Sequence, residues 1–229
     1  MIRRPLREIH EIELSSVCNL ACVYCPHPTL RRPKAHMAAD VFRDALAHVK
    51  HYCRHGTQGE VSLTGIGEAI LHPAFIRMLE QTREVIGDRD LVLSTNGVAV
   101  TDSIARALAE YSVKTYVSLH RPEVAAPAIE RLKRYGVAYE VNHAFVDRSI
   151  DWAGQVDWHA SGARYVCDYL RLGWGVVRQC GSVDACCMDA HDLHPIGHVT
   201  DDPGSLHNNA LPLCGACNLT VPEEFRDGC

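Results

Sequence analysis

Two spacings of apolar residues alternate along the first 142 residues of the chain. Short runs rich in Ile, Val and Leu, each long enough for one β-strand, occur at residues 8–15, 60–64, 90–94, 114–118 and 137–142. Between these runs the apolar residues recur at helical spacing, as at Val41, Ala45 and Val49. This second pattern predicts helices at residues 38–54, 73–85, 103–110 and 123–135.

Strands that alternate with helices of this length form βα units and a parallel sheet. Right-handed crossovers curl five or six such units into an α/β fold of the partial, open (β/α)5–6 barrel type. We expect the barrel at residues 1–150 and a small cysteine-rich region, with a β-hairpin and a helix, at residues 151–229. The carboxyl ends of all the strands then meet at one mouth, where active sites of such folds lie.

The overall composition excludes several classes of function. Hydrophobic residues make up 47% of the chain and the formal net charge is −5, which gives no electrostatic reason to expect nucleic acid or an anionic membrane as partner. No apolar stretch approaches the roughly 20 residues of a membrane span. The basic start of the chain is not followed by the apolar region of a signal peptide, so we expect a cytoplasmic protein.

The cysteines change this ordinary picture. Eleven cysteines in a chain without an export signal favour metal or cluster binding over disulfides, since the cytosol keeps thiols reduced. Cys18, Cys22 and Cys25 follow the first predicted strand with the spacing CxxxCxxC. Three thiolates can hold three irons of a [4Fe–4S] cluster and leave the fourth iron for a small molecule. The alternative is a zinc site, with His27 as the fourth ligand.

This cysteine motif, with Tyr24 before its last cysteine, resembles the signature of the radical S-adenosylmethionine (SAM) superfamily. The resemblance implies a [4Fe–4S] cluster on the three cysteines, whose open iron chelates the amino and carboxylate groups of SAM. Gly65, Gly67 and Glu68 resemble the glycine-glycine-glutamate motif that binds the methionyl amino group in this superfamily, although Ile66 separates the two glycines.

Further candidate site residues follow the other predicted strands. Asn96 lies in a Thr-Asn-Gly sequence that resembles the superfamily's turn after the third strand, and that also fits a simple turn with positive φ. Ser118 and Asn142 end the fourth and fifth strands and are candidate SAM ligands, while His120 is a candidate residue facing the substrate.

The C-terminal part carries a second group of cysteines, and its spacing suggests a hairpin turn at Gly181 with a cysteine on the return strand. Four thiolates from separate segments suit a fully ligated second cluster, with a structural zinc as the alternative. The region resembles the twitch domain, a shortened auxiliary-cluster domain, and the whole chain is similar to the 2-deoxy-scyllo-inosamine dehydrogenases of butirosin biosynthesis. That resemblance implies that the auxiliary [4Fe–4S] cluster is held by Cys167, Cys186, Cys214 and Cys217.

Some residues of this region keep open roles. Cys180 could replace Cys167 as a ligand, and Cys187 or Cys229 could donate a hydrogen atom. An arginine that lies near substrate in the similar dehydrogenases is absent here or displaced to Arg148, which predicts a different substrate. Trp152 and Trp158 would make the pocket more apolar if they point inward.

The resemblance implies a mechanism with three outcomes. The reduced cluster cleaves SAM, and the resulting 5′-deoxyadenosyl radical takes a hydrogen atom from the substrate. Oxidation of the substrate radical through the auxiliary cluster is favoured, with epimerisation and peptide crosslinking as alternatives. A small natural-product substrate is favoured over a short peptide, because only about seven residues precede the first strand, and the reductant implied is a flavodoxin or ferredoxin. A zinc-stabilised binding module is the non-enzymatic alternative.

Overall fold

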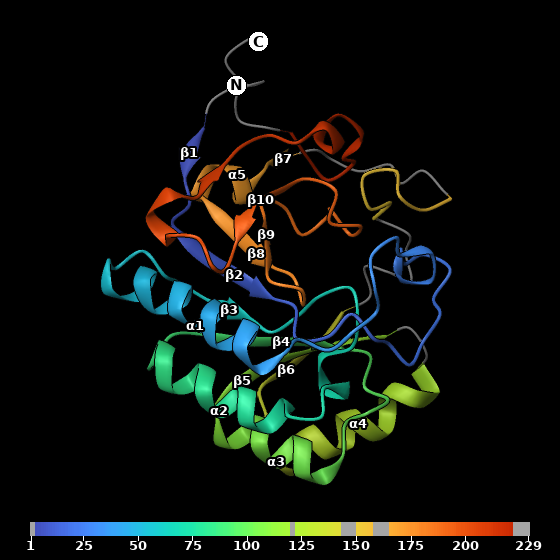
Figure 1. Cartoon of the computed structure of the whole chain (residues 1–229). Helices are drawn as coiled ribbons and strands as arrows, with labels where there is room; N and C mark the ends of the chain where they lie inside the picture. Colours follow the sequence, from blue (N-terminus) through green and yellow to red (C-terminus); the bar gives the residue numbers. More distant parts are fainter. Residues whose placement is uncertain (1–2, 120–121, 143–149, 158–164, 222–229) are drawn as a thin grey trace.

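The computed structural model describes residues 3–119, 122–142, 150–157 and 165–221. Its centre is an eight-stranded sheet with the order β10-β9-β8-β2-β3-β4-β5-β6 (Figure 1). The strands of this sheet are β2 (Glu8–Ile12), β3 (Val61–Ser62), β4 (Leu91–Thr95), β5 (Val113–Ser118), β6 (Tyr139–Asn142), β8 (Trp174–Val177), β9 (Ser182–Asp184) and β10 (Pro195–His198).

From β8 to β6 every neighbouring pair of strands in this sheet is parallel, which confirms the predicted partial barrel of α/β type. All five predicted strands are present, with small differences at their ends. The hairpin expected around Gly181 supplies β8 and β9, but its place in the sheet was not predicted: β8 pairs in parallel with β2, and β9 and β10 extend the sheet in antiparallel fashion. The chain segments on either side of residue 150, where we expected a domain boundary, therefore share one sheet.

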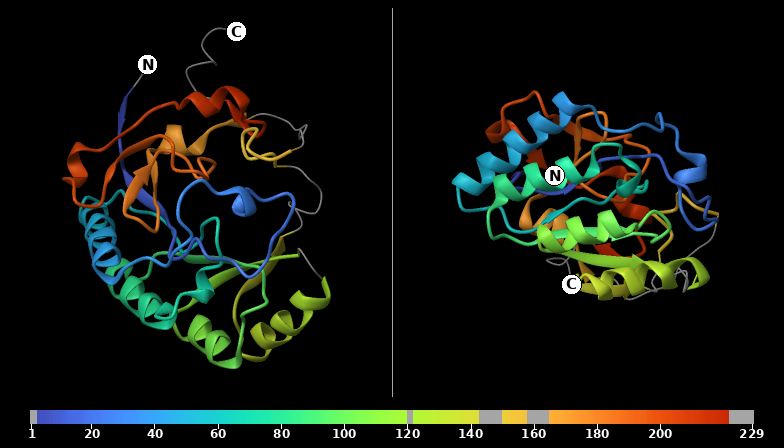
Figure 2. Two further views of the ribbon diagram at one scale, coloured as in Figure 1. Left: turned by 45° about the vertical axis from the view of Figure 1, so that its right-hand side comes forward. Right: turned by 90° about the horizontal axis from the view of Figure 1, so that it is seen from below.

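Four helices cover the outer face of the curved sheet, as Figure 2 shows, and a short fifth one precedes β8. They are α1 (Ala39–Arg54), α2 (Phe75–Ile86), α3 (Asp102–Glu110), α4 (Pro122–Arg134) and α5 (Asp168–Leu172). Each of the first four buries an apolar stripe; in α1 the stripe contains Phe42, Leu46 and Val49. These stripes and the outward-facing strand residues form one core, so the sheet's other face is left for the site.

Short elements complete the described structure. Four 3₁₀ helices are η1 (His27–Thr29), η2 (Ala69–Leu71), η3 (Pro203–Ser205) and η4 (Pro212–Ala216). Two further small sheets pair β1 (Arg4–Pro5) with β11 (His207–Asn208), and β12 (Thr220–Val221) with β7 (Tyr165–Val166). The β7–β12 pair is parallel, so it brings the chain after Cys217 beside the chain before Cys167.

The first cysteine motif lies on a loop whose two ends are fastened together. The Ser16 backbone N–H donates to the carbonyl of Ala35 at 2.9 Å, and the Ala35 N–H donates to the Ser16 hydroxyl at 2.9 Å. The Met37 N–H adds a bond of 2.9 Å to the carbonyl of Leu14. Residues 17–35 therefore form a closed loop that returns to the carboxyl end of β2 and lies over the inner side of the barrel (Figure 2). Among the described residues, no helix is both long and apolar enough to cross a membrane.

Candidate active site

One pocket at the mouth of the barrel gathers most of the predicted site residues. The predicted residues that line it are Cys18, Cys22, Tyr24, Cys25, Gly65, Gly67, Glu68, Asn96, Ser118, Asn142 and Cys187. Each comes from a loop or strand end at the carboxyl edge of the parallel sheet, or from the segment after β9. The sequence therefore identified the position of the pocket, while the roles of these residues stay predictions.

The sulfur atoms of the cysteine loop are surrounded by hydrogen-bond donors. The Leu20 N–H lies 3.5 Å from the Cys18 sulfur, and the His27 N–H lies 3.4 Å from the Cys25 sulfur. The Asn96 side-chain amide lies 3.8 Å from the Cys18 sulfur, and the Tyr24 hydroxyl hydrogen-bonds Cys22. Such donors stabilise negative charge on sulfur, which suits thiolate ligands of a cluster.

The protonation of these thiols also fits metal ligands better than nucleophiles. Burial raises the pKa of the Cys18 thiol and raises that of Cys25 to about 12, and the charged forms of the neighbouring cysteines add to both shifts. A nucleophilic cysteine requires a lowered pKa. A metal or cluster displaces the protons from such thiols when it binds and relieves the repulsion among their charges.

His27 is the residue on which the zinc alternative depends. Its Nε2 lies 3.1 Å from the Ser16 carbonyl, so this nitrogen donates to the backbone, and burial lowers the pKa of the ring. His27 lines the pocket, but this hydrogen bond occupies Nε2, so Nε2 is not free to bind a metal. In the described part of the chain, no three His, Cys, Asp or Glu side chains form a group that could hold one metal ion. Metal analysis decides between a cluster and zinc.

Glu68 and Asn96 line the pocket beside the cysteine loop. The Glu68 carboxylate accepts hydrogen bonds from the Thr95 hydroxyl and the Asn96 N–H, both at 2.8 Å. Burial raises the pKa of Glu68 to about 7 in spite of these donors. Gly97 has φ +82°, so the expected turn with positive φ is present, and the Asn96 amide that it positions reaches the cysteine loop at Asn19 (2.8 Å).

The packing of the protein leaves no room for a side chain at either glycine before Glu68. An ideal Cβ at Gly65 would lie 2.3 Å from Cγ of Glu13, and one at Gly67 would lie 2.3 Å from the carbonyl oxygen of Ser15. The loop therefore packs directly on residues 13–16, because neither position has space for a side chain.

The auxiliary cysteines lie behind this pocket. The β8–β9 hairpin turns at Gly181 with φ +96°, which confirms the predicted hairpin, and Cys186 lies just after β9. Cys186 is close enough to Cys167 for their charges to interact, and its sulfur accepts the Met188 N–H at 3.3 Å. Cys180 is exposed, and its thiol instead contacts Ser182 and Asp192.

Cys187 differs from its neighbour Cys186 because it lines the pocket at the mouth. Its thiol hydrogen-bonds Cys186 and Tyr169, and Glu11 is near enough for its charge to act on Cys187. The Cys214 sulfur accepts the Leu211 N–H at 3.3 Å, which gives it the same kind of donor that Cys186 has. The Arg178 guanidinium contacts the carbonyls of both Cys186 and Cys187 at 3.0 and 3.3 Å.

Sequence reasoning missed part of the pocket lining. The pocket residues to which the sequence analysis gave no role are Glu11, Leu20, Thr64, Ile66, Ser94, Thr95 and Met188. A signal for Glu11 existed, because it is an acidic residue among the apolar residues Ile9, Ile12 and Leu14, all of which are buried. Trp152 lines the pocket as expected, with φ +54°. His120, Arg148, Trp158 and Cys229 lie outside the described residues.

Comparisons with known proteins agree with this geometry. Residues 12–123 match the family model of the radical SAM superfamily. The chain is 30% identical over 146 residues to GTP 3′,8-cyclase of Aquifex aeolicus (strain VF5), a match that covers 61% of this chain and 44% of that protein. It is 29% identical over 102 residues to the tungsten-containing aldehyde ferredoxin oxidoreductase cofactor-modifying protein of Pyrococcus furiosus, covering 44% and 27%. The match thus spans less than half the length of these curated relatives.

Solved structures share the fold over a larger part of the chain. BtrN in complex with AdoMet and 2-DOIA superposes with a TM-score of 0.68 at 21% identity, covering 86% of this chain and 80% of BtrN. The structure of anSMEcpe with bound AdoMet and the Cp18Cys peptide gives a TM-score of 0.59 at 16% identity, covering 87% of this chain and 79% of that chain. Streptococcus suis SuiB bound to its precursor peptide SuiA gives 0.62 at 14% identity, covering 93% and 70%. At these identities the likeness establishes the fold, including the twitch-like C-terminal part.

The family match covers the cysteine loop, the Gly65–Glu68 loop and the turn at Asn96, which supply most of the residues that line the pocket. The fold likeness extends through the cysteine-rich strands β8 to β10. We conclude that residues 12–123 form a radical SAM domain.

Proposed function

We propose that this chain is a radical SAM dehydrogenase that oxidises a small polar molecule at an unactivated carbon, with a [4Fe–4S] cluster, SAM and an auxiliary cluster as cofactors. The observation that carries the proposal is the single pocket that Cys18, Cys22 and Cys25 line together with Glu68 and Cys187. SAM and a substrate would be bound side by side there. The fold likeness to BtrN, a radical SAM dehydrogenase, supports the oxidative outcome.

In this proposal Cys18, Cys22 and Cys25 hold the first cluster, and Cys167, Cys186, Cys214 and Cys217 hold the second, within a twitch-like region at residues 151–229. When bound, these groups supply an electron and a 5′-deoxyadenosyl radical for hydrogen abstraction, and an acceptor for the second electron of the oxidation. A flavodoxin or ferredoxin is the proposed reductant.

The chain's own residues bind and orient SAM. The Glu68 carboxylate, fixed by Thr95 and Asn96, is placed to accept hydrogen bonds from the methionyl amino group. Ser118 and Asn142 are neighbours across the β5–β6 pair and present their side chains to the same pocket. Tyr24 and the backbone of Gly65 and Gly67 complete the proposed SAM site. Preorganised donors and acceptors of this kind align the reacting atoms before the chemical step.

The inner half of the pocket would hold the substrate. Glu11 extends from β2 into the pocket, where burial raises its pKa and Arg178 lowers it. The side chains of Thr64 and Ser94 add two hydroxyl groups, while Trp152 and Met188 add apolar surface. This mixture fits a hydroxyl- or amino-bearing small molecule, with the Glu11 carboxylate receiving a donor from it. His120 and Arg148 stay proposed substrate-facing residues.

Anaerobic reconstitution tests the proposal. We expect about eight irons per chain and an EPR signal of the reduced protein that changes when SAM is added. Replacing Cys18, Cys22 and Cys25 with Ala should abolish SAM cleavage and leave about four irons, whereas Cys214→Ala with Cys217→Ala should also leave about four irons but keep SAM cleavage. Zinc at both sites and no iron would end the proposal and leave the zinc-stabilised binding module.

Peptide modification is the second candidate, because two of the structures that share this fold were solved with peptides bound. Epimerisation is a further variant, in which the Cys187 thiol returns a hydrogen atom to the substrate radical and an external reductant restores the thiol. Product mass distinguishes epimerisation from oxidation, because a dehydrogenase product is two hydrogens lighter than the substrate and an epimer has the same mass. A crosslinked peptide is also two hydrogens lighter than its substrate, so peptide modification is recognised by the substrate that is consumed and by the new bond in the product.

A further inference from the structure

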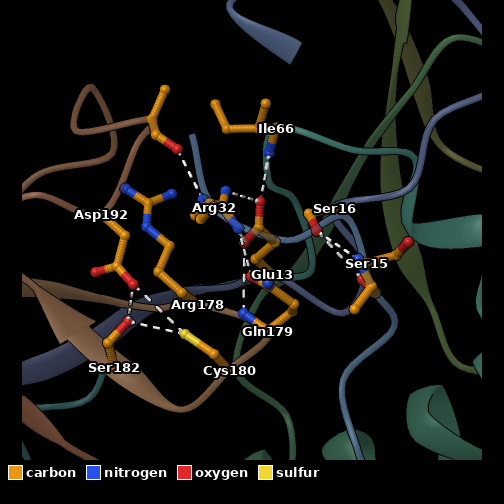
Figure 3. Close-up of polar contacts among 12 residues, drawn as sticks. Glu13, Ser15, Ser16, Arg32, Ile66, Arg178, Gln179, Cys180, Ser182 and Asp192 are labelled. Atoms are coloured by element: carbon orange, nitrogen blue, oxygen red, sulfur yellow. Dashed lines mark hydrogen bonds and ion pairs between the residues drawn. The ribbon is translucent and has the colours of Figure 1, made fainter. Parts of the chain in front are cut away.

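A fully buried ion pair lies directly beneath the Gly65–Glu68 loop. The Arg32 guanidinium donates from Nη1 and Nη2 to the two carboxylate oxygens of Glu13, both at 2.7 Å (Figure 3). The Glu13 side chain is wholly inaccessible to solvent, and that of Arg32 is 6% exposed. Glu13 follows β2, and Arg32 lies on the closed loop that carries the three cysteines.

The remaining bonds of this pair reach two more segments of the chain. Glu13 Oε1 accepts the backbone N–H of Ile66 at 2.9 Å, and Glu13 Oε2 accepts the backbone N–H of Gln179 at 3.4 Å. Arg32 donates from Nε to the carbonyl of Ala190 at 2.7 Å and from Nη1 to the Gln179 side-chain oxygen. Four segments thus meet at two side chains: the end of β2, the cysteine loop, the Gly65–Glu68 loop and the region after β8.

The backbone groups that these hydrogen bonds hold lie in or next to the pocket. Ile66 stands between the two glycines and two residues before Glu68, and Ile66 itself lines the pocket. Ala190 follows Met188, which lines the pocket on the side of Cys187. A buried pair of charges is a poor source of net stability, because apolar side chains of the same size often pack as well. Its geometry, in contrast, fixes the directions of all the groups it binds.

We propose that Glu13 and Arg32 are positioning residues that hold the Ile66 N–H, and with it the Gly65–Glu68 loop, in the conformation that binds SAM. Through Gln179 and the Ala190 carbonyl, the same pair fixes the Cys186–Met188 segment relative to that loop. The inference rests on the proposed role of this loop in SAM binding. Neither residue touches the pocket, so both act through the backbone that they hold.

Three double or single variants test the proposal on the anaerobically reconstituted full chain. Glu13→Met with Arg32→Met removes both charges together, so no unpaired charge stays buried, but it also removes the acceptor of the Ile66 N–H. Glu13→Gln with Arg32→Met keeps an acceptor oxygen at that place. Arg32→Lys keeps the positive charge and loses the bidentate hydrogen bonding to Glu13. The readouts are iron content, circular dichroism and the SAM dissociation constant from equilibrium dialysis.

We expect the double Met variant to keep its iron and secondary structure and to bind SAM at least tenfold more weakly. The variant with Gln at position 13 should recover affinity to within about threefold of wild type, which a general loss of packing would not allow. Glu8→Gln is the matched control, because Glu8 is also a buried carboxylate of β2 and accepts the Gly59 N–H at 2.7 Å at the opposite end of β3. It should leave SAM binding unchanged.

The outcomes separate this inference from the proposed function. If wild type does not bind SAM, or if Glu68→Gln binds it normally, the role of the loop is wrong. If Glu68→Gln loses affinity while the double Met variant retains it, the positioning role is wrong. Equal losses in the Met and Gln double variants would also overturn it, since the acceptor for Ile66 would then be irrelevant. Should the double Met variant fail to fold, unchanged SAM affinity of Arg32→Lys would overturn the proposal.

Discussion

The side chain of Glu13 occupies the space that any side chain at position 65 would need. An ideal Cβ at Gly65 would stand 2.3 Å from Cγ and 2.8 Å from Cβ of Glu13. Glu13 cannot move aside easily, because Arg32 and the Ile66 N–H hold its carboxylate. Gly65 and Glu13 therefore depend on each other. The Glu13 carboxylate holds the Gly65–Glu68 loop through the Ile66 N–H, and the lack of a side chain at Gly65 lets the loop pack against Glu13.

Gly65→Ala should consequently act on SAM binding and on stability together. We expect a loss of about 1–3 kcal/mol in the free energy of unfolding, as is usual when a packed interior is overfilled, with weaker SAM binding. Urea unfolding and equilibrium dialysis measure the two effects. Gly204→Ala is the control, because its nearest contact would be an ordinary 3.6 Å from Asp202. Equal behaviour of the two variants would contradict the packing explanation.

Glu68 should make SAM binding depend on pH. Burial raises its pKa to about 7, so the carboxyl loses its charge as the pH falls from 8 to 6 and accepts hydrogen bonds from the methionyl amino group less well. About one tenth of the carboxyl is ionised at pH 6 and about nine tenths at pH 8, so we expect the dissociation constant to be about tenfold higher at pH 6.

The control for this prediction is Glu68→Gln. Any titration of SAM itself affects both proteins alike, so the difference between their pH profiles isolates Glu68. The stability of the protein without SAM depends on pH in the opposite direction to SAM binding. The folded state holds the Glu68 proton more tightly than the unfolded chain, so this group's contribution to stability falls as the pH rises from about 4.5 to about 7. Identical profiles of wild type and variant would show that Glu68 does not titrate in this range.

The sequence predicted the barrel because each βα unit carries its own local pattern. It predicted the hairpin at Gly181 but not that β8, the hairpin's first strand (Trp174–Val177), joins the barrel by pairing with β2 more than 160 residues earlier. A strand this short has too little periodicity to recognise, and only the long-range pairing reveals it. Arg32 likewise has no local sequence pattern that indicates its role, because its partners Glu13 and Ala190 are distant in the sequence.

The site was predicted as far as motifs reach. Residues that resemble a superfamily motif, such as Cys18, Glu68 and Asn96, were expected at the mouth and line its pocket. Glu11 and Cys187 differ from them, because whether they belong to the site depends on the direction of the side chain and not on a motif. Nothing in the sequence decides which of the adjacent thiols Cys186 and Cys187 faces the pocket, since this depends on the turn after β9.

The two adjacent cysteines should therefore respond differently to substitution. Cys186 is near Cys167 and has a backbone donor on its sulfur, so Cys186→Ala should reduce the iron content from about eight to about four. Cys187→Ala should keep about eight irons and SAM cleavage, because its thiol belongs to the pocket wall. Iron counting and the amount of 5′-deoxyadenosine formed give the answer. Loss of iron in Cys187→Ala with normal iron in Cys186→Ala would reverse the assignment.

Arg178 should be required for the auxiliary site in a way that can be separated from its effect on stability. It is fully buried, pairs with Asp184 at 2.5 Å, and donates to the carbonyls of Cys186 and Asp189, both at 3.0 Å. Arg178→Met alone leaves Asp184 buried without its partner and should cost about 3–5 kcal/mol. Urea unfolding of the metal-free protein measures this loss.

Removing Asp184 as well should restore much of that stability, because no unpaired charge is then left in the interior. The carbonyl of Cys186 would still lack its donor, so we expect Arg178→Met with Asp184→Leu to be stable yet to hold only about four irons. Arg171→Met, which breaks an exposed pair with Asp168, should cost less than about 1 kcal/mol and keep all the iron. If the stable double variant also keeps about eight irons, Arg178 only balances the charge of Asp184 and does not position the cysteine segment.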